Sequence, residues 1–210
     1  MKEQEKYWGK FSATYDEYTE YVVGRDLRNA ILEKLRTEGY LGDTLETGCG
    51  TGFFTGVIAS KAKHLTATDI SAEMLAAAEK NAGSHGDVIF RTADCQDLPF
   101  GTGEFDTVFM ANVLHAVESP EKALNETRRV LKSGGLLLVI CYTDYGMNWF
   151  EKMILGIKFL EKFGLPPPYG LRNYSPLEFE HLISNAGFRM EEILLIGNRP
   201  AALYARARSN

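Results

Sequence analysis

The sequence predicts an α/β fold: a doubly wound, mostly parallel sheet with helices on both faces and an antiparallel edge. Short apolar strands alternate with helical segments over residues 43–141, the arrangement that builds a parallel sheet from strand–helix–strand units. Near the carboxyl end, the strands expected over residues 188–197 and 201–207 are joined by only three residues, too few for a parallel crossover. The last two strands must therefore pair in antiparallel fashion.

The composition is that of a globular protein and argues against several classes of function. Hydrophobic residues make up 45% and charged residues 24% of the 210 residues, which fits one folded domain, residues 1–210. The net charge of −5 argues against nucleic-acid binding, which needs clustered Lys and Arg. No apolar run suggests a signal peptide or membrane insertion, and Cys49, Cys95 and Cys141 are too far apart to suggest a disulfide framework or a metal site. A cytoplasmic protein is expected.

Two helices are expected before the first strand. Aromatic and apolar residues recur at helical spacing over residues 4–20, which predicts an amphipathic helix. A second helix presents Leu27 and Ile31 on one face and should end at Gly39, since glycine readily adopts the left-handed conformation that ends helices. Together these helices form an amino-terminal region, residues 1–40.

The core contains five strands and the helices between them. The strands are expected over residues 43–47, 64–69, 87–91, 105–110 and 136–141. The helices are expected over residues 53–61, over 71–81 with a Ser71 cap and a break at 83–86, and from Ser119–Pro120 onward. The run Leu136–Cys141 is continuously apolar, as in a strand that is buried on both faces.

An insertion over residues 145–173 separates the fifth strand from the last helix and is expected to form a cap. Its helical apolar stripe consists of Phe150, Met153, Ile154, Ile157 and Leu160. A capping box over Ser175–Glu178 then begins a helix that runs to Asn185. This helix and the strand pair make up residues 175–207.

Four features fall at the rim formed by the carboxyl ends of the strands, where open parallel sheets bind ligands. The first is the segment Glu46–Gly52, whose glycines allow sharp turns and a close approach to a ligand. It does not fit the dinucleotide pattern, because Thr55 stands where Gly or Ala is required, and no Gly-Lys-Ser/Thr follows as in a P-loop. A nucleoside ligand without phosphates is therefore favoured.

The next two features are acids at strand ends. Asp69 ends the second strand, where a carboxylate can accept hydrogen bonds from both ribose hydroxyls; the alternative is an exposed aspartate at a helix entry. Asp94 and Cys95 follow the third strand. There the carboxylate can accept from an exocyclic amine and the next backbone N–H can donate to a ring nitrogen, which would select adenine. The alternative is an aspartate with a role in a turn.

The fourth feature is the segment Ala111–His115, directly after the fourth strand, whose backbone could face the ligand and a second reactant together. His115 is a candidate general base; the alternative is a partly buried, hydrogen-bonded histidine with a structural role. Tyr142 and Asp144 are further candidate bases near the strand ends.

Taken together, these segments resemble the class I S-adenosylmethionine-dependent methyltransferases, in particular the type 11 group that includes ubiquinone-biosynthesis-like enzymes. The matching segments are Phe11–Asp16, Leu45–Gly52, Asp69–Ser71, Met74–Leu75, Ala93–Cys95, Asp97–Phe100, Phe105–Asp106, Leu114–His115 and Arg129–Gly135. They cover residues 11–141 in order, and the last helix and strand pair match more loosely. The resemblance implies a Rossmann-like, seven-stranded sheet whose last strand is antiparallel. It also implies S-adenosylmethionine as cofactor and S-adenosylhomocysteine (SAH) as product.

The resemblance further implies roles for individual residues. Glu46 would orient the loop or meet the amino group of the methionine part, and Asp69 would hold the ribose. Asp94 and Cys95 would contact adenine, and Tyr15 would be a lid residue over the cofactor. The other implied cofactor contacts are Gly48, Cys49, Gly50, Gly52, Ile70, Met74, Ala111 and Asn112.

The implied reaction is an in-line displacement that moves a methyl group to a small-molecule acceptor. Positioning two reactants can supply roughly 7–11 kcal/mol, so a dedicated base is needed only if the acceptor must lose a proton. The stripe of the insertion, with Trp149, suggests an apolar or aromatic acceptor; packing of the cap, a homodimer contact or a membrane-surface helix are the alternatives. Two other functions stay open: a nicotinamide-dependent oxidoreductase, and a protein that binds S-adenosylmethionine without catalysis.

Overall fold

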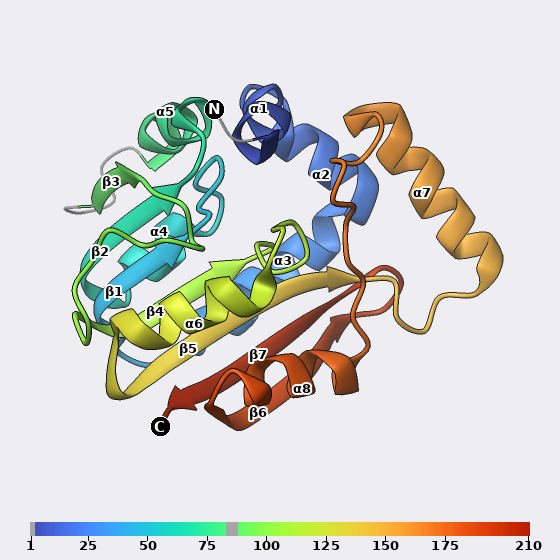
Figure 1. Cartoon of the computed structure of the whole chain (residues 1–210). Helices are drawn as coiled ribbons and strands as arrows, with labels where there is room; N and C mark the ends of the chain where they lie inside the picture. Colours follow the sequence, from blue (N-terminus) through green and yellow to red (C-terminus); the bar gives the residue numbers. More distant parts are fainter. Residues whose placement is uncertain (1–2, 83–87) are drawn as a thin grey trace.

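The computed structural model describes residues 3–82 and 88–210, and its framework is one seven-stranded sheet (Figure 1). The strands are β1 (Gly42–Thr47), β2 (Ala62–Asp69), β3 (Val88–Thr92), β4 (Phe105–Ala111), β5 (Leu131–Thr143), β6 (Phe188–Gly197) and β7 (Ala201–Ser209). Their order is β3–β2–β1–β4–β5–β7–β6; β1 to β5 run parallel, and β7 is antiparallel to β5 and β6. The predicted fold class is confirmed.

Helices cover both faces of this sheet and the rim at the carboxyl ends of its parallel strands. They are α1 (Glu3–Gly9), α2 (Tyr15–Val23), α3 (Arg25–Arg36), α4 (Thr55–Ala59), α5 (Ala72–Ala82), α6 (Pro120–Val130), α7 (Trp149–Phe163) and α8 (Pro176–Asn185). Ser119 and Ser175 cap α6 and α8 as predicted. The helix break expected at residues 83–86 lies outside the described residues.

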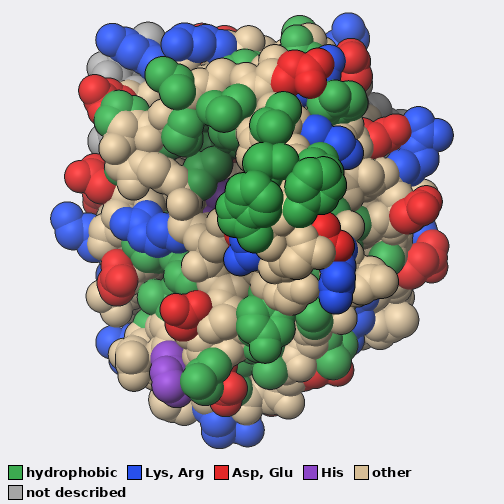
Figure 2. Space-filling view, turned by 90° about the vertical axis from the view of Figure 1, so that its right-hand side faces the viewer, with side chains coloured by type: hydrophobic (Ala, Val, Ile, Leu, Met, Phe, Trp, Pro, Cys, Tyr) green, Lys and Arg blue, Asp and Glu red, His purple; other side chains and the backbone are tan. Residues whose placement is uncertain are grey.

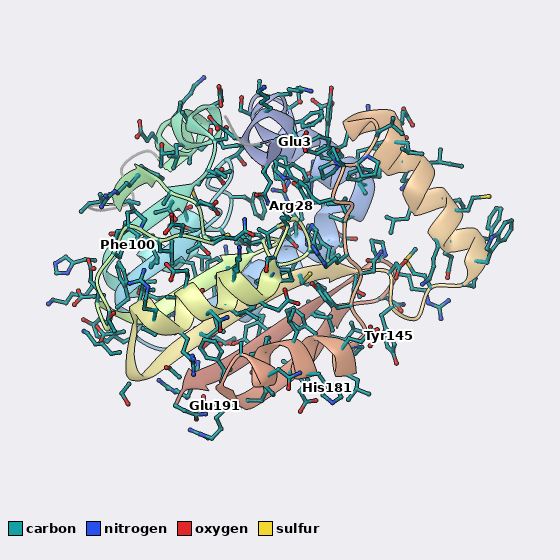
Figure 3. All side chains as sticks on the ribbon, viewed as in Figure 1. Glu3, Arg28, Phe100, Tyr145, His181 and Glu191 are labelled. Carbon is teal, nitrogen blue, oxygen red and sulfur yellow. The ribbon has the colours of Figure 1, made fainter. Side chains whose placement is uncertain are left out.

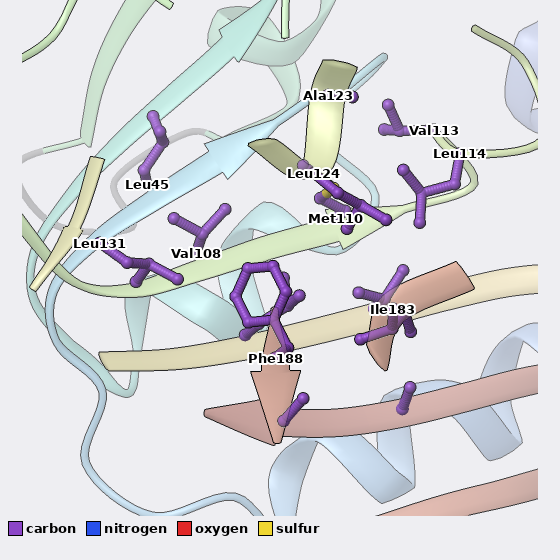
Figure 4. Packing of buried hydrophobic residues seen from close by; sticks show 14 of the residues in the cluster. Leu45, Val108, Met110, Val113, Leu114, Ala123, Leu124, Leu131, Ile183 and Phe188 are labelled. Atoms are coloured by element: carbon purple, nitrogen blue, oxygen red, sulfur yellow. The ribbon is translucent and has the colours of Figure 1, made fainter. Parts of the chain in front are cut away.

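Apolar side chains that alternate along the strands form a core on each face of the sheet. Leu124 of α6 and Val108 of β4 belong to one core, which also receives α8 (Figure 4). Ile31 of α3 and Phe109 of β4 belong to the other. The run Leu136–Cys141 is buried throughout and contributes to both cores, as predicted.

The order of the strands reverses between β1 and β4, which are neighbours in the sheet although β2 and β3 lie between them in the sequence. The connections from these two strands therefore leave toward opposite faces and open a crevice at the carboxyl rim. The segments after β1, β2, β3 and β4 all begin at this rim, so the four predicted features meet there.

The amino-terminal residues form two helices, and the prediction of one helix over residues 4–20 is wrong. A turn separates α1 from α2, and in it the N–H of Phe11 donates to the carbonyl of Trp8 at 3.0 Å. Gly9 ends α1 so close to α5 that a Cβ would lie 2.8 Å from the Glu73 carboxylate. Aromatic side chains continue at helical spacing through the turn, so periodicity could not reveal it. The turn places α1 over the rim (Figure 1).

Two other predicted boundaries are also wrong. The second helix, α3, ends at Arg36, where the Thr37 hydroxyl donates to the carbonyl of Lys34 at 2.7 Å, and Gly39 has no left-handed conformation. α4 is shorter than the helix predicted over residues 53–61. Its first predicted turn is part of the tight loop after β1.

The cap, residues 145–173, is tied to the amino-terminal helices by aromatic side chains. Five rings surround Phe163 of α7, with ring centroids 5.0–6.4 Å from its own: Trp8, Phe11, Tyr15, Tyr18 and Phe159. We call these six residues the Phe163 cluster. The Tyr7 hydroxyl also donates to the Phe163 carbonyl at 3.3 Å. The cap, α1 and α2 therefore pack as one unit above the rim.

The predicted apolar stripe of α7 faces away from the sheet. Phe150 is 57% and Ile157 is 55% exposed, and apolar side chains gather on this face of the molecule (Figure 2). Packing of the cap therefore does not explain the stripe, because these side chains are not covered. In the described part of the chain, no helix has both the length and the apolar character needed to cross a bilayer.

Candidate functional site

A cavity with an empty volume of about 630 Å³ lies at the carboxyl rim, beneath α1. We call it the rim cavity. Ten of the thirteen predicted cofactor-binding residues line it: Tyr15, Gly48, Gly50, Asp69, Ile70, Met74, Asp94, Cys95, Ala111 and Asn112. Ala93, Val113, Ala116 and Val117 extend this lining. Gln4 and Trp8 of α1 add to it, and the Gln4 side-chain amide donates to the carbonyl of Ala116 at 2.7 Å. Sequence reasoning missed both residues because the turn after α1 was not predicted.

A smaller cavity of about 400 Å³ continues inward from the rim cavity and shares five lining residues with it: Tyr15, Gly48, Gly50, Ala111 and Asn112. We call it the inner cavity. Glu46 and Cys49, two further predicted residues, line it. Glu46 is 2% exposed, and its Oε2 atom has no hydrogen-bond partner among the described residues. Burial, with a contribution from the charge of Asp69, raises the pKa of Glu46 to about 7.

Arg28 of α3 also lines the inner cavity and was not predicted from the sequence. Its guanidinium donates to the Asp16 carbonyl at 2.9 Å and pairs with the Asp16 carboxylate, which in turn accepts a hydrogen bond from the Thr51 hydroxyl at 2.7 Å. The guanidinium carbon lies 3.5 Å from the ring centroid of Phe53. The Arg28 Nε atom is buried without a hydrogen-bond partner in the described structure, so one donor position is unfilled.

Arg28 lies in the interior of the molecule, near the strand ends (Figure 3). A signal for it exists in the sequence. Arg28, Ile31 and Leu35 are spaced for one helix face, and the last two are fully buried. A charged residue on an apolar helix face needs a partner or a ligand, because an unpaired buried charge is costly.

The glycine-rich loop after β1 contains two glycines that line the cavities and one that packs against α5. Gly48 has a φ of 65°, and a Cβ there would lie 2.4 Å from Val113 Cγ2. Gly50 has a φ of 56°, and its N–H donates to the Asp69 carboxylate at 2.9 Å. Gly52 lines neither cavity; a Cβ there would lie 3.2 Å from the Cα atom of Ala78 in α5. A φ of 83° and close packing against α5 therefore explain the glycine at position 52.

Asp69 is held in place by backbone donors and still faces the rim cavity. Its Oδ1 accepts from the N–H of Ser71 and its Oδ2 from the N–H of Gly50, both at 2.9 Å. The two carboxylate oxygens have about four lone-pair positions, so acceptor capacity remains for a ligand beside these donors and the N–H of Ile70. Asp69 is 8% exposed, and this burial raises its pKa. The alternative of an exposed helix-entry aspartate is therefore wrong.

Asp94 forms a turn and also lines the rim cavity. Its Oδ1 accepts from the N–H of Gln96 at 2.9 Å, and its carbonyl accepts from the N–H of Asp97 at 2.9 Å, which together form a turn. Asp94 and Cys95 also line the rim cavity. The turn therefore fixes the direction of the side chain at the cavity wall.

Asn112 adopts a left-handed conformation with a φ of 60°, unusual for a residue other than glycine. Its N–H donates to the Ile140 carbonyl at 2.8 Å, and its Oδ1 accepts from the N–H of Tyr142 at 2.9 Å. Such a conformation costs about 1–3 kcal/mol and persists only where neighbours impose it. It turns the chain after β4 so that Ala111 and Asn112 line both cavities.

A third cavity, with an empty volume of about 1260 Å³, lies between α2, α7 and the end of β5. We call it the cap cavity. Trp8 and Tyr15 line both it and the rim cavity, and therefore form the boundary between the two. Burial raises the pKa of Tyr15 to about 12, so this boundary carries no charge from the tyrosine at neutral pH.

His115 lines the cap cavity and lies outside the rim cavity. Its Nδ1 is 3.4 Å from the Cys141 Sγ, and burial lowers its pKa to about 4. A histidine with so low a pKa is neutral at pH 7 and accepts a proton poorly. These neighbours favour the structural alternative, and the catalytic role of His115 stays a prediction. Tyr142 and Asp144 line the same cavity, and Asp144 pairs with Lys152 at 3.1 Å.

The rim and inner cavities are complementary to a nucleoside joined to an amino acid. Asp69 can accept from a diol, while Glu46 and Arg28 each keep one unfilled bonding position in the inner cavity. A crevice of this composition at the reversal of strand order, on a sheet with this strand order, defines a Rossmann-like S-adenosylmethionine-dependent methyltransferase fold.

Comparison with known proteins identifies the family within this class. Residues 45–139 match the type 11 family model, described as a methyltransferase domain, and this part of the chain is a domain of that family. The DhpI–SAH complex superposes with a TM-score of 0.76 and 25% identity, over 99% of this chain and 96% of that one.

Two curated relatives support the same family. The ubiquinone/menaquinone biosynthesis C-methyltransferase UbiE of Sinorhizobium fredii is 35% identical over 148 residues, which cover 68% of this chain and 57% of the relative. The malonyl-[acyl-carrier protein] O-methyltransferase of Legionella pneumophila is 32% identical over 151 residues, which cover 68% and 51%. The chain thus spans about half the length of these relatives.

Proposed function

We propose that the protein transfers the methyl group of S-adenosylmethionine to a small acceptor, apolar or aromatic, by in-line displacement. The observation that carries this proposal is the pair of unfilled positions on Glu46 Oε2 and Arg28 Nε, buried in one cavity. Buried polar groups without partners are costly, so a ligand with complementary groups binds there favourably. The ammonium and carboxylate of an amino acid are complementary to this pair.

The described residues fit the other parts of the cofactor as well. Asp69 would accept from the ribose hydroxyls, and Asp94 and Cys95 would contact the adenine, beside Ile70 and Met74. When bound, S-adenosylmethionine supplies a methyl group that is already activated. The chain's own task is to hold the two reactants in line and to exclude water, which can account for roughly 7–11 kcal/mol of the barrier. The acceptor would approach from the cap cavity, past Trp8 and Tyr15.

Calorimetry with SAH tests this proposal. The protein is expected to bind SAH and not NADH, and Asp69→Ala should weaken SAH binding roughly 10- to 100-fold, because hydrogen bonds to a charged group contribute about 1.5–3 kcal/mol. Asp26→Ala, an exposed aspartate on α3, is the matched control and should bind SAH like the wild type.

The outcomes separate the three functions. Equal SAH affinity in Asp69→Ala and the wild type would remove Asp69 from the site, and binding of NADH without SAH would favour an oxidoreductase. Incorporation of labelled methyl from the cofactor into a product, in a broad acceptor screen, distinguishes a methyltransferase from a protein that only binds the cofactor.

The affinity for SAH is expected to rise with pH up to about pH 7. The pKa of Glu46 without ligand is about 7, and the ionised form is the one that pairs with the ligand ammonium. Below this pH, binding must release a proton from Glu46, which weakens binding by up to tenfold, or about 1.4 kcal/mol, per pH unit. Calorimetry at pH 6 in two buffers of different ionisation enthalpy should detect the release of up to one proton on SAH binding. The same measurement at pH 8 should detect much less proton release. The same affinity at both pH values, without proton release, would contradict the pairing.

A further inference from the structure

Polar and apolar side chains line the cap cavity from different elements. His115, Tyr142 and Asp144 come from the segments at the carboxyl ends of β4 and β5, whereas Val22 comes from α2 and Leu155 and Phe159 come from α7. The two kinds of lining therefore suit two unlike parts of one molecule.

The charged side chains in the lining already have partners within the chain. Lys152 pairs with Asp144, with Nζ and Oδ1 3.1 Å apart. The guanidinium of Arg172 donates to the carbonyls of Val117 and Glu118. His115 is neutral at pH 7 because burial lowers its pKa to about 4. An uncharged occupant can therefore enter without disrupting an ion pair.

Gly156 lies in the middle of α7 and lines the cap cavity. Glycine destabilises a helix interior relative to alanine, so its presence there calls for a physical reason. Two common reasons do not apply to Gly156. It has no left-handed conformation, and a Cβ built on it would meet no atom within 4 Å, in contrast with Gly48. The missing side chain instead leaves open space at the cavity wall.

We propose that Gly156 keeps open an apolar subsite between α2 and α7 that receives the apolar part of the methyl acceptor. The acceptor is then an uncharged molecule whose polar, methyl-accepting end lies toward β5 and the boundary formed by Trp8 and Tyr15. This inference rests on the proposed function and specifies its acceptor. A side chain at position 156 shortens the subsite and selects against acceptors with a large apolar part.

The experiment uses 4-butylphenol as a probe, because it joins an uncharged polar end to an apolar chain. SAH and then the probe are titrated calorimetrically into the wild type, Gly156→Ala, Gly156→Leu and the control Ile157→Phe. Ile157 is the next residue on α7 and is 55% exposed, so the control adds bulk outside the cavity. Thermal unfolding of each variant checks that α7 is intact, and Gly156→Ala should unfold at a higher temperature than the wild type.

The wild type and Ile157→Phe are expected to bind the probe alike. Gly156→Leu should bind the probe at least tenfold more weakly than the wild type, and the affinity of Gly156→Ala should lie between the two. The affinity for SAH should be unchanged in all variants. Equal probe binding in Gly156→Leu would overturn the role of Gly156, and a wild type that binds SAH but not the probe would overturn the acceptor class. If the wild type fails to bind SAH, the proposed function is wrong, and titration of the probe into the free protein still decides whether the subsite exists.

Discussion

Replacing Glu46 by glutamine is expected to stabilise the ligand-free protein and to weaken SAH binding at the same time. Burial raises the pKa of Glu46 from 4.5 to about 7, so the folded protein holds this proton more tightly than the unfolded chain. Its contribution to stability is fully present below pH 4.5 and is lost as the pH rises toward 7. Above pH 7 the ionised carboxylate lowers the free energy of unfolding by about 3 kcal/mol, and glutamine avoids this cost.

Urea unfolding at pH 8 and pH 4.5 measures the first effect. Glu46→Gln should exceed the wild type in the free energy of unfolding by up to about 3 kcal/mol at pH 8, and the difference should vanish near pH 4.5. Glu79→Gln, at an exposed glutamate on α5, is the matched control and should change neither quantity. A Glu46→Gln protein that is less stable at pH 8, or that binds SAH as tightly as the wild type, contradicts the assignment.

Replacing Phe163 by alanine is expected to detach the cap from the amino-terminal helices. Phe163 is 7% exposed and contacts the five other rings of the Phe163 cluster. Removing a buried phenylalanine side chain costs about 3–5 kcal/mol. Since the cluster lies outside the two cores of the sheet, the loss should fall mainly on local opening of α7 and α1.

Hydrogen exchange measures this opening. The amides of α7 should exchange roughly 100-fold faster in Phe163→Ala, the factor that corresponds to about 3 kcal/mol, while those of β5 change little. SAH should also bind more weakly, because Trp8 and Tyr15 lose a packing partner. Phe150→Ala, which removes an exposed phenylalanine from the same helix, is the control and should leave both measurements unchanged. Unchanged exchange in Phe163→Ala would show that other contacts hold the cap.

The sheet and most of the rim cavity could be predicted because both follow from local patterns in chain order. Alternating strands and helices predict a parallel sheet, and the carboxyl ends of parallel strands lie at one rim of the sheet. Asp69, Asp94 and Asn112, distant in sequence, therefore line one cavity. The short connection before β7 also sufficed to predict the antiparallel edge.

The packing of helices against the rim could not be predicted in the same way. Arg28 lines the inner cavity because of the way α3 packs on one face of the sheet, and the periodicity of α3 alone does not give this orientation. α7 is apolar over much of its circumference, so the stripe with Phe150 and Ile157 did not indicate which face lines the cap cavity. Leu155, Gly156 and Phe159 do so, together with Leu160, the one member of the stripe that lines this cavity. Gln4, Trp8 and Arg28, which were not predicted, are thus placed by the packing of their helices.

In the proposed function, the shared boundary between the rim and cap cavities would couple the exchange of the two reactants. Trp8 and Tyr15 belong to both walls and to the Phe163 cluster, so α1 cannot swing outward without loosening α7. The same two side chains therefore form part of the wall of both cavities. Spent cofactor and methylated product are expected to leave in one opening event, and the lifetime of the closed boundary then sets an upper limit on turnover.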